Sequence, residues 1–419
     1  MLQNWKCNAT SVAKATATVG RYALIAAVLL SGANCAMAEK FTVGVIPDTQ
    51  NYVDYANYTN PAALQRFVDE TTYLANNKTA LNLAYVTHVG DVVQHGDLSR
   101  SGDAVDGEWK RAQTALNVLA DANVPFGLVP GNHDYANYSH STGSRPLSGN
   151  DKWNQYFGPD SSFYAGKSWY GGSYNGGMDS FQTFTGGGKT FLSLELEMDP
   201  SNGALAWAQS VIDSHPGLAT IITTHSFLNP TTNVKTQDNS QARANDISTY
   251  FPGTSVNNTP DQVWSKLIEG NDQIFMVLCG HNWNGTDSSG VSNGENLRID
   301  NNDFGHPVYQ VLSDLQGNTF SYDTTTGTYT PGVYTGGEGW LRLMEFDTEA
   351  NTIHFQTYSP TLGLYAGVGD GPNFKLDPSF SDFTLPIPIQ AKAVPEPSTL
   401  TALFMGGLTF FVSKRKAKA

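Results

Sequence analysis

Five polar residues lie just beyond the ends of five apolar, strand-like segments in this chain. They are Asp48, Asp91, Asn132, His225 and His281. A single histidine after a strand usually has a structural role. Carboxylate, amide and imidazole groups delivered by several strands, however, form a donor set that suits divalent metals such as Mn, Fe, Zn or Mg. The pattern therefore predicts a metal site to which separate parts of the chain contribute.

Polar residues are most concentrated after one of these strand-like segments, in the sequence Val-Pro-Gly-Asn-His-Asp at residues 129–134. An apolar stretch over 124–129 predicts a buried strand, which the following Pro-Gly pair ends. Asn132, His133 and Asp134 come directly after it. A strand, a sharp turn and a polar cluster form the arrangement by which an open sheet presents reactive groups.

The elements that must position these residues alternate along the chain. Strands are predicted at 41–46, 83–89, 124–129, 190–196, 219–224, 273–279, 308–314, 339–347 and 352–359, the last two as a hairpin at a sheet edge. Helices are predicted at 61–75, 109–120, 203–214 and 261–269. This alternation implies parallel strands with right-handed crossovers. The predicted fold class is therefore α/β, in which sites lie at the carboxyl ends of strands.

The alternation stops over residues 135–188, where Gly, Ser, Tyr and Asn dominate. This composition predicts a long irregular region of functional or decorative loops. Its aromatic residues either line a substrate cleft or pack the loops onto the core. They include Trp153, Tyr156, Phe163, Trp169, Tyr170 and Tyr174. Arg342, in a later strand, leaves a similar choice between a phosphate contact and a structural pair with a carboxylate.

Residues 1–38 have the composition of a secretory signal peptide. They contain three basic residues and no acidic one, an apolar run at 22–30, and an Ala-Met-Ala end at 36–38. The run is shorter than the roughly 20 residues that a spanning helix needs. We therefore expect cleavage by signal peptidase after residue 38 rather than a permanent anchor. Two of the three cysteines would leave with this leader, so Cys279 could form no internal disulfide.

The C-terminal end of the chain has the composition of a second targeting signal. Residues 384–397 are Pro-rich and end in Pro-Glu-Pro, and residues 398–419 contain an apolar stretch and a basic tail. This order resembles the bacterial PEP-CTERM sorting signal, which is handled by an exosortase. A plain tail anchor is the alternative, but the apolar stretch is short for a permanent span. We expect only transient membrane contact through this tail. The final location would be the Gram-negative envelope, the cell surface or the extracellular space, with residues 39–383 as the globular domain.

The charge balance limits the classes of binding partner. The net charge is −14, and without the leader 21 Lys and Arg stand against 38 Asp and Glu. Stable nucleic-acid binding is not expected, because phosphate-driven affinity needs clustered cations. A small phosphorylated molecule remains possible where metal ions supply the positive charge.

The ordered motifs resemble those of the calcineurin-like metallophosphoesterase superfamily. Its blocks are Asp-x-His, Gly-Asp, Gly-Asn-His-Asp/Glu, a lone His and Gly-His-x-His. The matching segments here are Pro47-Asp48-Thr49-Gln50, Gly90-Asp91, Gly131-Asn132-His133-Asp134, His225 and Gly280-His281-Asn282-Trp283. The resemblance covers about residues 41–359. It implies a four-layer αββα sandwich, with two packed mixed β-sheets between helices, and metal-dependent hydrolysis of phosphate mono- or diesters.

The resemblance also implies two divalent metal ions, Mn, Mg, Fe or Zn. Asp91 would bridge both ions, and Asp48 would belong to the first site. Asn132, His225 and His281 would complete the second site. Two such cations lower the pKa of a shared water and neutralise phosphate oxygens, so the expected reaction is attack by a metal-bound hydroxide.

Two further residues acquire roles from the same resemblance. His133 would donate a proton, or a hydrogen bond, to the leaving oxygen of the phosphate-ester substrate. Asp134 would orient the imidazole ring of His133.

The chain departs from the family pattern at two positions of the first metal site. Gln50 replaces the histidine of the first block, and Trp283 replaces the second histidine of the last block. An indole N–H is only a donor, whereas an amide offers a carbonyl oxygen. We therefore expect a weak or exchangeable first site, in which Asp48, Asp91, Gln50 and water hold Mn or Mg.

The predicted function is that of an exported, metal-dependent phosphoesterase. The alternative is a catalytically weak, one-metal binding protein of the cell surface or extracellular matrix, which Gln50 and Trp283 would permit. A structural matrix component, with the Gly- and Tyr-rich region as its contact face, is a third possibility. The pair His133-Asp134 favours catalysis, because a binding protein has little need of a leaving-group acid. The substrate does not follow from the fold.

Overall fold

The computed structural model describes residues 40–54, 61–96, 102–137, 147–230, 242–283, 294–316, 320–323, 328–331, 337–366 and 378–388. The expected signal peptide, the Pro-Glu-Pro segment and the sorting signal lie outside these residues. Among the helices in the described ranges, none combines the length and the apolar character that a membrane span requires.

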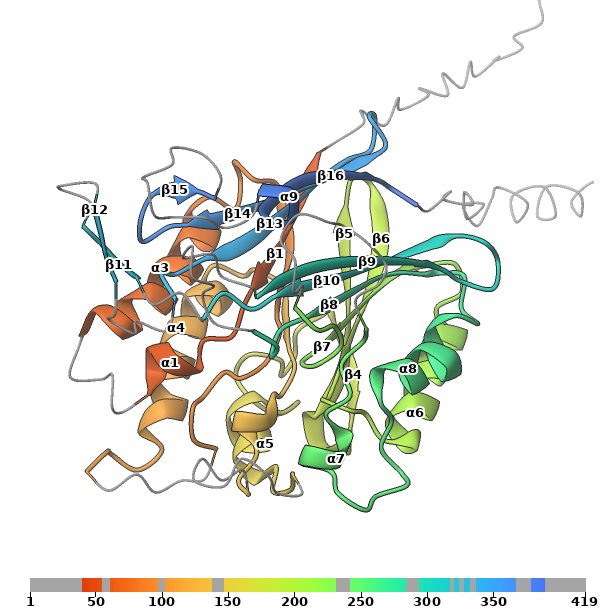
Figure 1. Ribbon diagram of the computed structural model, residues 1–419, viewed down its shortest axis with the longest axis horizontal. Helices are drawn as coiled ribbons and strands as arrows, with labels where there is room; N and C mark the ends of the chain where they lie inside the picture. The colour runs from red at the N-terminus through yellow and green to blue at the C-terminus, as the bar shows by residue number, and fades with distance from the viewer. Residues whose placement is uncertain are drawn as a thin grey trace, which may run out of the picture. The chain divides into compact units, whose positions relative to one another are not determined.

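The first sheet joins strands from the beginning and the end of the domain (Figure 1). In spatial order it contains β15 (Leu364–Tyr365), β14 (Thr352–Ser359), β13 (Leu341–Asp347), β1 (Phe41–Ile46), β2 (Leu83–His88) and β3 (Phe126–Leu128), and β16 (Asp382–Pro386) also pairs with β14. Strands β1, β2 and β3 are parallel, whereas β13 joins β1 antiparallel. The expected β13–β14 hairpin is present, but it lies inside the sheet rather than at its edge, because β15 and β16 pair with β14.

The second sheet is also mixed. In spatial order it contains β4 (Tyr170–Tyr174), β5 (Asp179–Gly186), β6 (Lys189–Leu196), β7 (Ala219–Thr224), β8 (Ile274–Cys279), β10 (Pro307–Ser313) and β9 (Glu295–Asn301). The four strands β6, β7, β8 and β10 run parallel, so their carboxyl ends share one edge. A separate pair is formed by β11 (Phe320–Asp323) and β12 (Thr328–Pro331).

Helices cover the outer faces of the two sheets (Figure 1). On the first sheet lie α3 (Pro61–Asn76) and α4 (Gly107–Asp121), and on the second lie α6 (Asn202–Ser214), α8 (Pro260–Val263) and a π-helix (Trp264–Ile268). A third apolar cluster, which includes Phe41, Phe191 and Phe346, packs between the sheets. Phe41 lies 4.6 Å from Phe346 and 5.3 Å from Phe191 between ring centroids. The expected arrangement of two packed mixed sheets between helices is confirmed.

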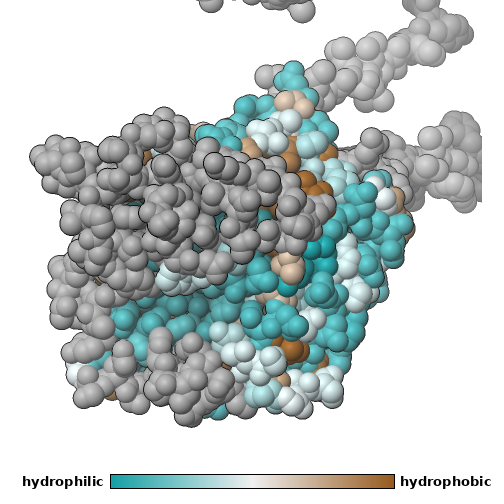
Figure 2. All heavy atoms as spheres, in the orientation of Figure 1, coloured by the Kyte–Doolittle hydropathy of each residue, from teal (hydrophilic) through white to brown (hydrophobic). Residues whose placement is uncertain are grey.

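Short helices complete the described chain. They are α1 (Gln50–Val53), α5 (Asp151–Phe157), α7 (Ile247–Tyr250), α9 (Pro378–Ser381) and the 3-10 turns Asn132–Asp134 and Asn175–Gly177. On the face drawn in Figure 2, the described residues are mostly hydrophilic, and hydrophobic ones form only small patches.

The expectation of a long irregular region at 135–188 is wrong. The described part contains α5, β4 and β5, and β5 forms a hairpin with β6. The glycines mark tight turns between strands: Gly187 and Gly188 have φ of 55° and 71° and form the two-residue connection from β5 to β6. Left-handed φ at both positions is the geometry that such hairpins prefer. Trp153 and Phe163 are buried in the core, so packing is confirmed for these aromatic residues.

The fold also extends beyond the expected domain boundary at residue 383. Strand β16 continues to Pro386, and its residue Leu385 pairs with Ile353 of β14. The start of the expected Pro-rich linker at 384 is therefore part of the first sheet.

Arg342 is a structural residue of the interior. Its side chain is fully buried and donates to Glu295 Oε1 at 2.7 Å, to Ser313 Oγ at 2.8 Å and to the Phe380 carbonyl at 2.8 Å. These contacts favour the structural alternative over a phosphate contact. They connect β13, β9, β10 and α9.

Arg342→Met should lower the free energy of unfolding by about 3–5 kcal/mol, because Glu295 would lose its buried cationic partner. The double variant Arg342→Met/Glu295→Gln should recover part of this loss, since it removes both charges. Urea unfolding of the three proteins measures both effects. A single variant within about 1 kcal/mol of the wild type would contradict the assignment.

Candidate metal centre

The strand ends of both sheets meet at a buried polar cluster. Asp48 follows β1, Asp91 follows β2, Asn132 begins the 3-10 turn after β3, His225 follows β7, and His281 follows β8. Asp48, Asp91, Asn132 and His225 are each at most 2% exposed. The structure thus brings together side chains that are up to 233 residues apart in sequence, as between Asp48 and the amide of His281.

Three possible ligand atoms converge around the Nε2 atom of His225. This atom lies 3.2 Å from Asp91 Oδ2, 3.2 Å from Asn132 Oδ1 and 3.1 Å from His281 Nδ1. The other ring nitrogen of His225 lies 2.8 Å from the carbonyl oxygen of Val89, a distance at which Nδ1 carries the proton and donates it. The lone pair of Nε2 therefore faces Asp91, Asn132 and His281. The structure thus brings together the side chains expected for the second metal site.

His281 has a carboxylate neighbour that the sequence does not reveal. While Nδ1 of His281 faces His225, its Nε2 lies 3.7 Å from Asp246 Oδ2. Asp246 in turn accepts a hydrogen bond of 2.8 Å from Ser226 Oγ. At 3.7 Å the approach of Asp246 to His281 is a contact rather than a hydrogen bond, so Asp246 is a neighbour of the His281 ring and not its anchor. Asp246 precedes α7 in a polar loop, so no strand-end pattern marks it.

The backbone at this edge is held in strained conformations. Asp91 and His281 have φ of 52° and 67°, which non-glycine residues rarely adopt. Such strain is typical of functional sites, where the surrounding structure enforces it. At Gly131 the requirement is space, because a Cβ there would clash with Asp91 Oδ1 and approach His225 Nε2 to 2.6 Å.

The expected first site contains oxygen donors. Asp48 Oδ2 accepts a hydrogen bond of 3.2 Å from the amide of His281. Gln50 is buried, and its Oε1 has no hydrogen-bond partner among the described residues. Trp283 is 36% exposed. Its indole N–H can only donate, so it does not replace the missing histidine as a metal ligand. A buried amide oxygen without a hydrogen-bond partner among the described residues is a ligand type that fits a hard divalent cation.

Two more residues of this region follow β10. Asp314 is fully buried, and Gln316 Nε2 donates both to Asp314 Oδ2 at 3.1 Å and to Asp48 Oδ2 at 3.3 Å. The sequence carried a signal for Asp314, because it ends an apolar segment as the other candidate ligands do. It was instead placed inside the predicted strand at 308–314.

Among the described residues, the buried carboxylates of this cluster lack the basic partners that would balance their negative charge. Burial raises the pKa of Asp48, and the charges of Asp314 and Asp91 raise it further. Burial also raises the pKa of Asp314 to about 7. At Asp91 burial acts in the same direction, but the charges of His225 and His133 outweigh it and hold the pKa well below its ordinary value. Within the described part of the chain, no Lys or Arg pairs with these three carboxylates. Divalent cations would supply the missing positive charge.

His133 lies beside Asp91 but is not oriented by Asp134. Its amide donates to Asp91 Oδ1 at 2.9 Å, its ring Nδ1 lies 2.9 Å from the Gln94 carbonyl, and its Nε2 lies 4.0 Å from Asp91 Oδ2. The prediction that Asp134 orients the ring is therefore not met, because the Gln94 carbonyl occupies that position.

Asp134 fixes the backbone of the site instead. Its carboxylate accepts hydrogen bonds from the amides of Val92 at 3.1 Å, Val93 at 2.9 Å and Gly131 at 2.8 Å. These contacts join the turn after β2 to the turn after β3. Asp134 thereby sets the relative position of the two turns that carry Asp91 and Asn132.

A second group of possible metal ligands, Asp54, His95 and Glu108, lies at the loop that follows Asp91. Glu108 Oε2 accepts from the amides of Gln94 and His95, and Glu108 Oε1 lies 2.8 Å from His95 Nδ1. Asp54 Oδ1 is 3.9 Å from the same nitrogen. Since Gln94 also contacts the His133 ring, Glu108 helps to hold the loop that positions this ring.

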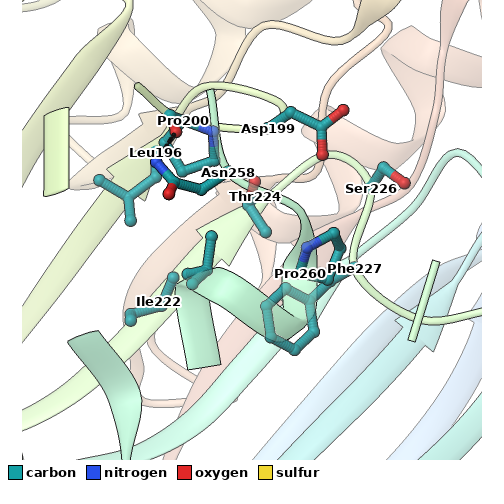
Figure 3. Close-up of a pocket in the computed structure, with 10 residues that line it drawn as sticks. Leu196, Asp199, Pro200, Ile222, Thr224, Ser226, Phe227, Asn258 and Pro260 are labelled. Carbon is teal, nitrogen blue, oxygen red and sulfur yellow. Dashed lines mark hydrogen bonds between the residues drawn. The ribbon is translucent and has the colours of Figure 1, made fainter. Parts of the chain in front are cut away.

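Asp199 is a buried acid at the edge of the site. Figure 3 shows its carboxylate and the Ser226 hydroxyl turned away from the apolar side chains of Leu196 and Ile222, which line a small pocket. Neither oxygen of Asp199 has a hydrogen-bond partner within the described residues. Burial, and then the charge of Asp246, raise the pKa of Asp199 to about 8.

Asp199→Asn should stabilise the protein more as the pH rises. The ordinary pKa of the group is 3.8, so between pH 3.8 and about 8 the folded state binds a proton that the unfolded state releases. Wild-type stability therefore falls over this range, and the variant should lack that part of the fall. Its backbone φ of 46° also suits Asn.

Thermal unfolding at about pH 5 and about pH 8.5 measures this difference. Asp213→Asn, on the exposed side of α6, serves as the matched control. An equal gain for Asp199→Asn at both pH values would contradict the raised pKa.

Two packed mixed sheets with an Asp, Asn and His cluster at their strand ends form a candidate metal centre. A family model described as "Calcineurin-like phosphoesterase" matches residues 41–306, and the chain belongs to this family. The resemblance drawn from the ordered motifs is thereby confirmed for the superfamily.

The chain is also similar to two individual proteins. One is described as "Uncharacterized protein YvnB" of Bacillus subtilis (strain 168), with 26% identity over 328 residues, or 77% of this chain and 20% of that protein. The chain thus spans about one fifth of the length of this curated relative. The other is a solved chain described as "GAP50 the anchor in the inner membrane complex of Plasmodium". Its identity is 11% and its TM-score 0.36, with 81% of this chain and 90% of that chain covered.

Proposed function

We propose that this protein is an exported phosphoesterase that uses two divalent metal ions to hydrolyse a phosphate mono- or diester. The observation that supports this most directly is the convergence of Asp91, His225 and His281. Each offers one ligand atom, and these atoms all lie within 4.8 Å of one another. Asn132 adds an amide oxygen to this group, and the unpartnered oxygen of Gln50 fits the first site.

The two ions, when bound, would neutralise phosphate oxygens and activate a water for in-line attack. The protein contributes the fixed geometry. The Val89 carbonyl holds the ring of His225, and the backbone amide of His133 holds one oxygen of Asp91. Because these groups are preorganised, little reorganisation is needed when charge develops on the phosphate.

His133 is the residue proposed to act on the leaving group. The Gln94 carbonyl anchors its Nδ1, which leaves Nε2 on the side of Asp91. Burial lowers the pKa of His133 below its ordinary value, and the charge of Asp91 offsets only part of this shift. A protonated Nε2 could give its proton to the leaving oxygen, and the ring would then be restored from solvent.

Export and processing form a separate part of the proposal. The signal peptide at 1–38 would be removed by signal peptidase, and the sorting signal at 398–419 by an exosortase. The intact mass of protein recovered from its native host tests this. A mature chain that begins at Glu39 and lacks the basic tail supports the proposal, and a chain that retains Lys418 would favour a tail anchor.

Turnover separates the enzyme from a one-metal binding protein. Purified protein is stripped of metal, supplied with Mn, Mg, Zn or Fe, and assayed on an aryl phosphate monoester and its diester. Metal-dependent turnover supports the enzyme, and the ratio of the two rates narrows the substrate class. Metal binding at His225 and His281 without turnover on any ester would favour the binding protein.

A further inference from the structure

We propose that Asp314 is a ligand of the first metal site, which becomes an all-oxygen site for a hard divalent cation such as Mn²⁺ or Mg²⁺. Its other protein ligands would be Asp48, Gln50 and Asp91. Gln316 would be a positioning residue that holds two of these carboxylates. This inference rests on the proposed metal-dependent function and specifies the composition of one of its two sites.

The position of Asp314 in the second sheet is equivalent to that of His281. Strands β8 and β10 are parallel, and Leu312 of β10 pairs with Cys279 of β8. Asp314 and His281 each stand two residues after this pair, at the same edge of the sheet. The rule that places His281 at the metal centre therefore places Asp314 there as well.

Asp314 is buried as an acid without a cationic partner. It is fully buried, Asp48 is 2% exposed, and neither carboxylate forms an ion pair with Lys or Arg in the described ranges. Each oxygen of Asp314 accepts one hydrogen bond from Gln316. The backbone amide of Gln316 donates to Oδ1, and its side-chain amide donates to Oδ2. A carboxylate oxygen has a further lone pair to offer. Buried charges that lack an ionic partner generally coordinate metals or become neutral.

Gln316 connects Asp314 to the first site. Its Oε1 accepts a hydrogen bond of 2.6 Å from Asn51 Nδ2, which fixes the orientation of the amide. Its Nε2 therefore faces the carboxylates and donates to both Asp48 and Asp314.

The chemistry of this donor set explains the two departures from the family pattern. Gln50 and Trp283 remove both imidazoles of the first site, and with them the preference for Zn. Asp314 would restore an anionic ligand in their place. Three carboxylates and one amide oxygen form a set that suits oxygen-preferring ions.

Metal binding provides a test that does not depend on activity. Mn²⁺ is titrated into metal-free wild-type protein and Asp314→Asn, and free Mn²⁺ is followed by electron paramagnetic resonance. We expect two bound ions in the wild type. In Asp314→Asn one ion should bind at least about tenfold more weakly, while the site of His225 and His281 is unchanged. Asp303→Asn, an exposed position near the same strand, is the matched control.

Thermal unfolding distinguishes loss of a ligand from loss of folding. With chelator present, Asp314→Asn should be at least as stable as the wild type, because a buried carboxylate without a cationic partner among the described residues is replaced by a neutral amide. With Mn²⁺ present, the variant should gain less stability than the wild type. Gln316→Met should also weaken the same ion, since it leaves every ligand in place but frees two carboxylates.

The outcomes separate this inference from the proposed function. Two ions bound with unchanged affinity in Asp314→Asn would overturn the role of Asp314 and leave the phosphoesterase proposal intact. A wild-type protein that binds no ion would overturn both. A variant that is unstable in chelator and equally stabilised by Mn²⁺ would make Asp314 a structural acid.

Discussion

Asp91→Asn should reduce kcat for phosphate-ester hydrolysis by about 10³-fold or more, the largest loss expected from any single substitution in this chain. Asp91 lies between the two proposed sites: its Oδ2 is 3.2 Å from His225 Nε2, and its charge acts on Asp48. An amide at this position would remove the negative charge that both ions need. Metal affinity should therefore fall at both sites together.

The substitution should leave the fold intact, which makes the loss interpretable. Asp91 has a φ of 52°, and Asn adopts this region readily. The Asn carbonyl oxygen can still accept the hydrogen bond from the His133 amide. Asp121→Asn, at the exposed end of α4, is the matched control and should be fully active. Wild-type turnover in Asp91→Asn would exclude Asp91 as a bridging ligand.

His133→Gln should have the second largest effect, and the effect should depend on the leaving group. For an alkyl phosphate, kcat should fall by roughly 10²–10⁴-fold, because a poor leaving oxygen needs a proton. For a nitrophenyl phosphate the loss should be much smaller, since nitrophenolate leaves without one. Metal content should not change, because no role in metal binding is assigned to the His133 ring.

Three measurements on the same protein preparation test this prediction. They are kcat on the two ester types, bound metal per chain, and the corresponding values for His306→Gln, whose ring is half-exposed on the far side of β10. An equal loss on both esters would assign His133 to phosphate binding. Loss of metal would assign it to the metal centre.

The strand-end pattern was sufficient to place most of the candidate metal centre. Asp48, Asp91, Asn132, His225 and His281 come together because the parallel strands of each sheet end at the same edge. Hydrophobic patterning also predicted the α/β class, since buried strands and amphipathic helices have different periods. The two packed sheets were implied by the family resemblance. These features depend on local sequence.

The features that the sequence did not reveal depend on tertiary packing. Asp246 lies near His281 in the folded chain, although no spacing in the sequence links the two. The carboxylate of Asp134 contacts three amides rather than the neighbouring ring, and no spacing rule specifies that direction. At 135–188, turn glycines that separate short strands gave the composition of a loop. Asp314 was missed because one residue of uncertainty at a strand end decides whether a side chain counts as a ligand or as part of the strand.

Occupancy and turnover measured together test the central claim most directly. Mn²⁺ is titrated into chelator-treated protein, and bound ion per chain and the rate of aryl phosphate hydrolysis are recorded at each point. The account predicts no turnover without ion and a rate that rises as the two sites fill. A rate that is unchanged after the bound metal has been removed would contradict a metal-dependent phosphoesterase.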